Sequence, residues 1–66
     1  MDVTVNGVAE QLGEPLTVAD LVGRYCRCPD GVAVARNGDV VPRSAWPHTP
    51  LRGGDRLEIL TAAPGG

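Results

Sequence analysis

The end of the chain carries the chemical group that stands out most in this sequence. A strand-like apolar stretch is followed by Ala62-Ala63-Pro64-Gly65-Gly66. Glycine has no Cβ, so a Gly-Gly end is thin and conformationally free. It can enter a narrow slot in another protein and present the α-carboxylate of Gly66 there. Because chain ends are commonly frayed and rich in small residues, the dipeptide alone does not distinguish a reactive tail from an idle one.

Two cysteines and one histidine are the other candidates for chemistry. Cys26 and Cys28 are two residues apart, a spacing that seldom forms a disulfide and supplies only half of a structural zinc site. His48 lies in a proline-bracketed segment and forms no recognisable nucleophile or acid–base arrangement with another residue. We therefore expect two half-buried free thiols, no metal, no bound cofactor and no catalysis by this chain.

Length and charge exclude several classes of protein. A chain of 66 residues makes one domain with a small core, so a large enclosed active site is not expected. The net charge is −2 and the six basic residues are scattered arginines, which argues against nucleic acid as a partner. No stretch is apolar enough to span a bilayer, and no signal peptide is recognisable. We expect a cytoplasmic protein without membrane contact.

The first half of the chain predicts a hairpin followed by a helix. Residues 2–6 and 8–12 flank Asn6-Gly7, a dipeptide that tolerates the positive φ angles of a tight turn. Thr17 is suited to cap a helix, and Asp20 favours its first turn. Pro29 predicts that the helix ends within residues 26–31. One face of this helix should pack on a sheet, and it comprises Leu16, Val18, Leu21 and Tyr25.

The second half predicts three strands and one buried indole. Residues 32–36 form an apolar strand, Asn37-Gly38-Asp39 a turn, and residues 40–41 a short strand halted by proline. The proline-rich residues 43–51 predict no more than a helical turn at 44–46, and we expect Trp46 to plug the core. Residues 52–55 form a turn before the last strand, 56–60, in which Leu57 and Ile59 point inward and Glu58 points outward.

These elements predict an α+β fold with a mixed sheet of four to five strands. One main helix packs on one face, and the C-terminal strand lies centrally beside the N-terminal one. We expect a domain over residues 1–62 and a flexible tail over residues 63–66. An exposed apolar patch on the open sheet face, around residues 56–60, would then serve for docking, with scattered arginines at its rim or simply solvated.

The order and spacing of several short motifs resemble one known family. They are Val5-Asn6-Gly7, Thr17-Val18-Ala19-Asp20-Leu21, Val32-Ala33-Val34-Ala35 with Asn37-Gly38, Val41-Pro42-Arg43 followed by Trp46, Leu51 with Gly54-Asp55, and Gly65-Gly66. Over its whole length the chain resembles the thiamine-biosynthesis sulfur carrier proteins, small members of the ubiquitin-like β-grasp group. Pro64, Cys26 and Cys28 depart from the family pattern.

This resemblance implies a carrier cycle centred on Gly66. An ATP-dependent adenylyltransferase/sulfurtransferase would adenylate its carboxylate, sulfur from a donor such as a cysteine desulfurase would replace the AMP, and the thiocarboxylate would give its sulfur to thiazole synthase. Gly65 and Pro64 would thread the partner's active site, and ATP would be used by the activating enzyme. Three alternatives stay open: a carrier for molybdopterin or a secondary metabolite, a ubiquitin-like protein modifier, and an interaction module with an idle end.

Overall fold

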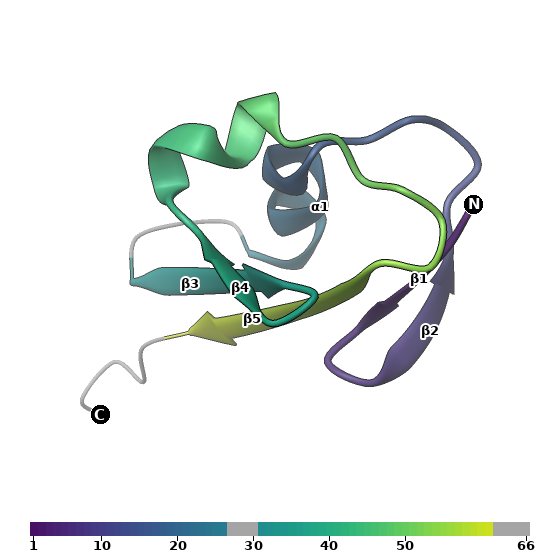
Figure 1. Ribbon diagram of the computed structural model, residues 1–66, viewed down its shortest axis with the longest axis horizontal. Helices are drawn as coiled ribbons and strands as arrows, with labels where there is room; N and C mark the ends of the chain where they lie inside the picture. The colour runs from purple at the N-terminus through teal and green to yellow at the C-terminus, as the bar shows by residue number, and fades with distance from the viewer. Residues whose placement is uncertain (27–30, 62–66) are drawn as a thin grey trace.

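A five-stranded mixed sheet covered on one face by helices makes up the part of the chain that the structure describes. The computed structural model describes residues 1–26 and 31–61. The strands follow the order β2-β1-β5-β3-β4, and α1 and a 3₁₀ helix, η1, lie on the same side of them (Figure 1). The elements are β1 (Asp2–Val5), β2 (Val8–Gln11), α1 (Val18–Tyr25), β3 (Val32–Arg36), β4 (Asp39–Val41), η1 (Arg43–His48) and β5 (Arg56–Thr61). The predicted α+β architecture is confirmed.

Both antiparallel hairpins turn at an Asn-Gly pair. Asn6 and Gly7 have φ angles of 51° and 82°, and Asn37 and Gly38 have φ angles of 52° and 88°. Positive φ at both central residues is the geometry that joins twisted antiparallel strands in two-residue turns. The first turn pairs β1 with β2, and the second pairs β3 with β4, as the sequence predicts.

Helix α1 begins at a capping box. The Asp20 backbone N–H donates to Thr17 Oγ1 at 3.2 Å, and the Thr17 backbone N–H donates to Asp20 Oδ2 at 2.9 Å. The hydrogen bonds from the Thr17 backbone and then its side chain hold the pKa of Asp20 below its ordinary value. The predicted start of the helix is therefore confirmed, and Cys26 ends it.

The predicted buried face of α1 is wrong in one residue. Val18, Leu21 and Val22 are buried, whereas Tyr25 is 46% exposed. Tyr25 is the last residue of α1, and its pKa is raised by partial burial and by the nearby Glu10 side chain of edge strand β2. Its ring therefore lies at the margin of the core.

Trp46 plugs the core, as predicted. Its side chain is buried, and the indole Nε1–H donates to the Val41 carbonyl oxygen at 2.9 Å. The surrounding helix is longer than the single turn at residues 44–46 that the sequence predicts, since η1 runs from Arg43 to His48 and contains Pro47. A 3₁₀ helix in a short piece can include proline because few of its N–H groups have intrahelical partners.

Strand β5 occupies the middle of the sheet. It pairs in parallel with β1 at two positions, Thr4 with Arg56 and Val5 with Leu57. On its other side it pairs antiparallel with β3 over five positions. Leu57 and Ile59 are buried and Glu58 is exposed, which confirms the predicted directions of these side chains. The strand that precedes the tail is thus the best-supported strand of the sheet.

Candidate functional site

The candidate site lies at the end of β5, where the tail begins. The residues expected to do chemistry and to enter a partner, Gly66, Gly65 and Pro64, lie outside the described residues, and so does Cys28. The boundary expected between residues 62 and 63 stays a prediction for the same reason. The structure therefore places the base of the tail, and the site is built from the contacts that hold β5 and from the face that β5 presents.

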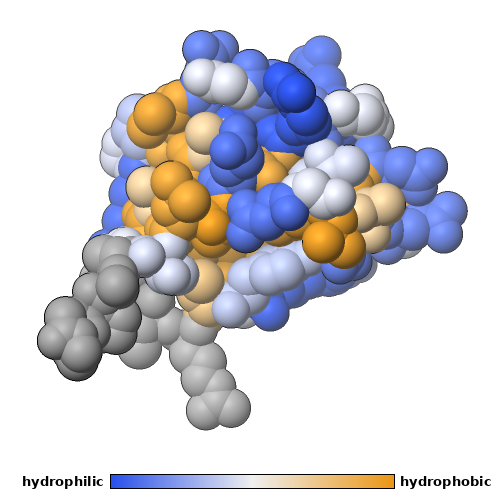
Figure 2. Space-filling view, turned by 90° about the horizontal axis from the view of Figure 1, so that it is seen from below, coloured by the Kyte–Doolittle hydropathy of each residue, from blue (hydrophilic) through white to orange (hydrophobic). Residues whose placement is uncertain are grey.

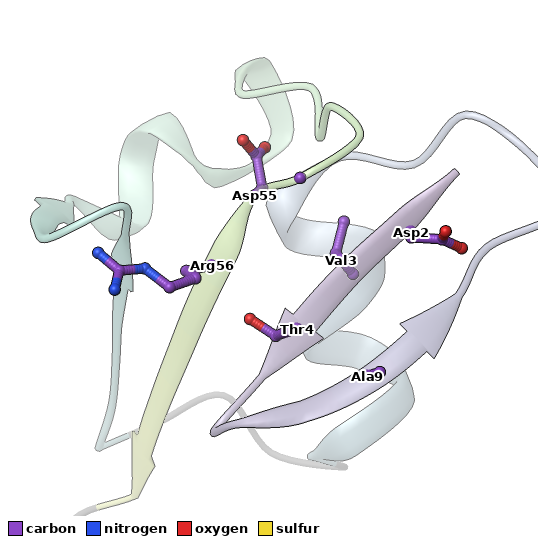
Figure 3. Close-up of a pocket in the computed structure, with 7 residues that line it drawn as sticks. Asp2, Val3, Thr4, Ala9, Asp55 and Arg56 are labelled. Carbon is purple, nitrogen blue, oxygen red and sulfur yellow. The ribbon is translucent and has the colours of Figure 1, made fainter.

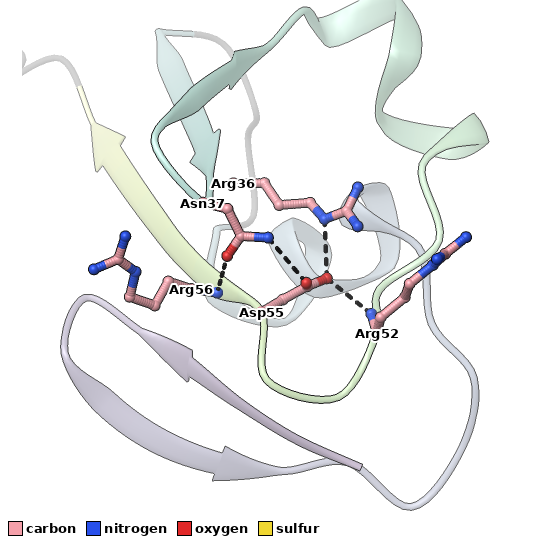
Figure 4. A network of polar contacts seen from close by, with 5 residues as sticks. All are labelled: Arg36, Asn37, Arg52, Asp55 and Arg56. Atoms are coloured by element: carbon pink, nitrogen blue, oxygen red, sulfur yellow. Dashed lines mark hydrogen bonds and ion pairs between the residues drawn. The ribbon is translucent and has the colours of Figure 1, made fainter.

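A buried carboxylate anchors the start of β5. Asp55 is only 5% exposed, and three groups donate to it: Arg36 Nε at 2.9 Å, the Arg52 backbone N–H at 2.8 Å and Asn37 Nδ2 at 3.1 Å (Figure 4). Asn37 Oδ1 also accepts from the Arg56 backbone N–H at 2.9 Å. The side chains of Asp55 and Asn37 thereby fix the turn between β3 and β4 to the loop before β5.

These donors determine the protonation of Asp55. Burial alone would raise its pKa, but the hydrogen bonds from the Arg52 backbone, Asn37 and Arg36, together with the charge of Arg36, hold the pKa below its ordinary value of 3.8. Asp55 is therefore ionised at neutral pH. Its oxygens are already bound by three donors, which makes it a structural carboxylate and an unsuitable general base.

A single side chain holds the other end of β5 on the β1 side. Asn6 Oδ1 accepts from the Ile59 backbone N–H at 2.8 Å, and Asn6 Nδ2 donates to the Ile59 carbonyl oxygen at 3.2 Å. The Asn6 backbone N–H donates to the Leu57 carbonyl oxygen at 2.9 Å. The first hairpin thus contacts β5 two residues before the described part of the chain ends at Thr61.

The sheet face opposite the helices carries an apolar patch. The ladder pairs Leu60 with Ala33 and Val40 with Ala35, so these four side chains share one face as neighbours. Leu60 is 64% exposed and Val40 is 75% exposed. The view from the sheet side shows hydrophobic side chains gathered among hydrophilic ones on this face (Figure 2). We call this group, Ala33, Ala35, Val40 and Leu60, the open-face patch.

The arginines contribute to this region unequally. Arg56 precedes Glu58 and Leu60 on the same face of β5 and is exposed. Arg36 is held by Asp55, and Arg24 pairs with Glu14 at 3.1 Å on the exposed surface. Arg27 lies outside the described residues. Arg56 is thus the arginine whose place in the sheet fits the rim of the open-face patch.

A small pocket lies at the start of β5, the end of the strand opposite to Thr61. Its volume is about 190 Å³, and it is lined by Asp2, Val3, Thr4, Ala9, Gly54, Asp55 and Arg56. The Asp55 carboxylate points away from Thr4 and Ala9 (Figure 3). The lining contains no histidine, cysteine or serine, and it has one hydroxyl, that of Thr4, and two carboxylates, those of Asp2 and Asp55, of which Asp55 is held by three donors. No histidine, cysteine or serine is therefore placed in this pocket to act as a nucleophile or a general base.

Of the cysteine and histidine candidates, the structure describes Cys26 and His48. Cys26 is a half-buried free thiol, as expected, and His48 is exposed at the end of η1. Among residues 1–26 and 31–61, no three histidine, cysteine or acidic side chains gather in a way that could hold a metal ion. None of the helices in these ranges has the length and apolar character needed to cross a membrane.

Sequence reasoning missed the roles of two residues whose side chains hold β5. Asp55 was expected only as a turn residue, and Asn6 only as a residue that tolerates positive φ. An acidic residue between Gly53-Gly54 and an apolar strand was a usable signal, because a strand start in the sheet centre leaves donors to satisfy. For Asn6 no local signal existed, since its partner Ile59 is 53 residues away.

Comparison with known proteins agrees with this architecture. The model of the ThiS family matches residues 2–66. A thiazole synthase of Paramagnetospirillum magneticum (strain AMB-1) is 33% identical over all 66 residues, and the chain spans a fifth of that protein's length.

Two solved structures share the fold over the whole chain. The crystal structure of the thiamine biosynthesis protein (ThiS) from Geobacter metallireducens has a TM-score of 0.83 and 33% identity, and the match covers 100% of both chains. An NMR structure of a thiamine biosynthesis protein from the same organism gives the same TM-score and identity and is covered to 88%. With the family match reaching from β1 through the terminal glycines, the chain belongs to the ThiS family, a family of small carrier proteins with the β-grasp fold.

Proposed function

We propose that this protein carries sulfur for the formation of the thiazole ring of thiamine, with the α-carboxylate of Gly66 as the carrier group. The observation that supports the proposal most strongly is the family match, which extends over residues 2–66 and so includes Gly65 and Gly66. In this proposal the protein is a co-substrate in the cytoplasm, and the enzymes that act on its tail supply the catalysis.

The proposed chemistry needs an activated carboxylate. A carboxylate oxygen is a poor leaving group, and the negative charge repels nucleophiles. Attack of the Gly66 carboxylate on the α-phosphate of ATP releases pyrophosphate and forms an acyl-adenylate with AMP as leaving group. The terminal sulfur of a persulfide made from cysteine then displaces AMP and forms an acyl disulfide, and a thiol such as free cysteine reduces its S–S bond and releases the thiocarboxylate. An adenylyltransferase/sulfurtransferase performs these steps, and a cysteine desulfurase is the sulfur donor that fits them.

The tail composition suits this use. Gly65 and Gly66 present bare backbone, so a slot that fits them excludes ordinary side chains from the same place. Pro64 has no backbone N–H and a restricted φ angle, which stiffens the segment before the glycines. Binding in such a slot makes the reaction effectively intramolecular, and this positioning supplies much of the rate.

The folded domain supplies the docking surface in this proposal. The open-face patch contains Leu60, which precedes the tail by one described residue, and exposed Val40. Exposed apolar groups with a polar rim are typical of surfaces that bind other proteins. An enzyme that covers this patch also has the base of the tail within the same interface.

Thiazole synthase is the proposed acceptor of the sulfur. The thiazole synthase of P. magneticum contains a segment similar to this whole chain. In that relative, a segment similar to this chain and a thiazole synthase lie in one polypeptide. This arrangement is what we expect if separate proteins of these two kinds act in consecutive steps. This observation favours thiazole over molybdopterin as the destination.

Intact-mass spectrometry tests the proposal. The protein is incubated with ATP, cysteine, a cysteine desulfurase and an adenylating enzyme that acts on ThiS-family proteins. Its mass is compared before and after. We expect the mass gain of one oxygen replaced by sulfur, localised to the peptide that contains Gly66. The same incubation without ATP is the control and should give no gain.

The acceptor is then tested separately. Purified thiocarboxylate protein is supplied to thiazole synthase and, in parallel, to a molybdopterin synthase catalytic subunit. Sulfur transfer to the thiazole product alone supports the proposal, and transfer to the molybdopterin precursor alone overturns the acceptor. Absence of both adenylate and thiocarboxylate would leave an interaction module with an idle end, and Gly66 found in isopeptide linkage to lysines would indicate a protein modifier.

A further inference from the structure

Strand β1 stops before the strand that it supports. Its parallel pairing with β5 covers only Thr4 with Arg56 and Val5 with Leu57, after which the chain turns away at Asn6-Gly7. Strand β5 continues to Thr61. Among residues 1–26 and 31–61, no strand therefore lies beside this side of β5 beyond Leu57, although β3 still pairs with its other side as far as Thr61.

The side chain of Asn6 takes the place of the missing strand. A primary carboxamide has the same acceptor and donor as a peptide group. In the ladder, the Thr4 N–H donates to the Asp55 carbonyl and the Asn6 N–H donates to the Leu57 carbonyl. The next β5 residue that faces β1 is Ile59, and both of its backbone groups bind the Asn6 side chain, at 2.8 Å and 3.2 Å. Asn6 thus extends the parallel ladder by one peptide unit.

This contact bears on the direction in which β5 leaves the sheet. Five residues separate Thr61 from Gly66, and a chain of that length spans at most about 17 Å when extended. When the domain docks through the open-face patch and the tail lies in a slot, both ends of this segment are fixed. A change in the direction of β5 at Thr61 moves the start of this short segment, which can compensate only within its limited length, and a misplacement of about 1 Å at the reacting group is enough to slow the reaction.

We propose that Asn6 is a positioning residue for the Gly66 carboxylate. It acts by holding the backbone of Ile59 and so fixing the direction in which β5 leaves the sheet. The inference rests on the proposed sulfur-carrier function, and it assigns a part in tail delivery to a residue of the opposite end of the chain. Asn6 touches no reacting group, and its effect passes through the backbone of β5.

Asn37 provides a matched control. It is also the first residue of an Asn-Gly turn, its φ angle of 52° is close to the 51° of Asn6, and its side chain likewise contacts β5 with one donor and one acceptor. These contacts are made at Asp55 and Arg56, the start of β5. Glycine tolerates positive φ, so Asn6→Gly and Asn37→Gly both keep the turn and remove the carboxamide. Both variants should lose stability, whereas only Asn6→Gly should increase the backbone motion of Leu60 and Thr61, where β5 ends.

The experiment compares wild type, Asn6→Gly, Asn6→Asp and Asn37→Gly in two measurements at a temperature where all are folded. NMR relaxation gives the backbone order of Leu60 and Thr61, and steady-state kinetics give kcat and KM for adenylation by the activating enzyme. Asn6→Asp keeps the size and the acceptor but places a second oxygen against the Ile59 carbonyl. We expect both Asn6 variants to lower the order at Leu60 and Thr61 and to lower kcat about tenfold, with KM within about twofold. Asn37→Gly should leave all of these near wild type.

Each outcome has a distinct meaning. Unchanged order and unchanged kcat in folded Asn6→Gly and Asn6→Asp overturn the inference, as does an equal loss of kcat in Asn37→Gly. Lower order at the exit with unchanged kcat also overturns it, because Asn6 would then be only structural. If wild type itself is not adenylated, the proposed function fails, and an unchanged order at Leu60 and Thr61 in the Asn6 variants would still contradict the structural half of the inference.

Discussion

At its start β5 is held by a buried carboxylate with three donors, and at its end by one carboxamide on one side and β3 on the other. Asp55 binds Arg36, Asn37 and the Arg52 backbone in a site that is 5% exposed. At the other end, Leu60 is 64% exposed. The strand therefore begins at a buried, charged contact and ends at an exposed, apolar side chain.

This difference separates two tasks within six residues. A partner enzyme can bind the exposed side chains at the end of β5. The buried contacts at the start of β5 remain within the domain and keep it folded. Changes at the start of β5 should therefore affect the free energy of unfolding, and changes at its end should affect reaction with partners. The predictions below test this separation, beginning with the largest effect on stability.

Removing the Asp55 carboxylate should have the largest effect. Asp55→Ala leaves the Arg36 side chain and the Arg52 N–H without their acceptor. Because the Arg36 side chain is 26% exposed and keeps part of its hydration, the free energy of unfolding should fall by about 2 kcal/mol in a denaturant titration, the size expected for losing hydrogen bonds to a charged group. Glu58→Ala, an exposed position on the same strand, is the control and should change it by less than about 0.5 kcal/mol. An Asp55→Ala protein as stable as the control would refute the anchoring role.

Protonating Asp55 should have a smaller effect, because the side chain remains in place. Its folded-state pKa lies below the ordinary value of 3.8, so its contribution to stability is complete above that value and is lost as the pH falls through the lower, folded-state pKa. We expect the free energy of unfolding of wild type to drop over this acidic range. The drop should be smaller in Asp55→Asn, where Asp20, whose pKa is also lowered, still contributes. Parallel pH profiles of the two proteins would contradict this assignment.

Changing Leu60 should have the smallest effect on stability and a clear effect on binding. Leu60→Ser removes exposed apolar surface, so the free energy of unfolding should stay within about 0.5 kcal/mol of wild type. The KM for the activating enzyme should rise by about tenfold, because a leucine side chain is no longer buried in the complex.

Val8→Ser is the matched control for this change. Val8 is 60% exposed, but it pairs with buried Val5 and therefore belongs to the helix side of the sheet. The KM of the activating enzyme for the Val8→Ser variant should remain close to that for wild type. An equal rise in KM for both variants would show that the enzyme does not select the open-face patch.

Local signals were sufficient to predict most of the fold. Asn6-Gly7 and Asn37-Gly38 predicted both turns, and the Thr17–Asp20 pair predicted the start of α1, because each depends on residues within a few positions of each other. The alternation in β5 also predicted which side chains point inward. The central place of β5 followed from the number and order of the elements.

The parts that were missed depend on residues far apart in the chain. Asp55 is buried because β3 brings Arg36 and Asn37, 19 and 18 residues away, beside it. Asn6 meets Ile59 only after the parallel pairing of β1 and β5 has formed. The prediction for Tyr25 failed because helical periodicity does not show where the sheet beneath the helix ends. The tail residues Pro64, Gly65 and Gly66 remain predictions.

Thiazole formation with altered tails tests the central claim most directly. Wild type, a variant with one alanine added after Gly66 and a variant lacking Gly66 are each supplied to the adenylating enzyme, the sulfur donor and thiazole synthase, and the thiazole product is quantified. The account predicts product with wild type and none with either variant, although both should fold like wild type because β5 is unchanged. Product at the wild-type rate from either variant, with its mass showing no trimming or addition, would contradict the claim that the Gly66 carboxylate carries the sulfur.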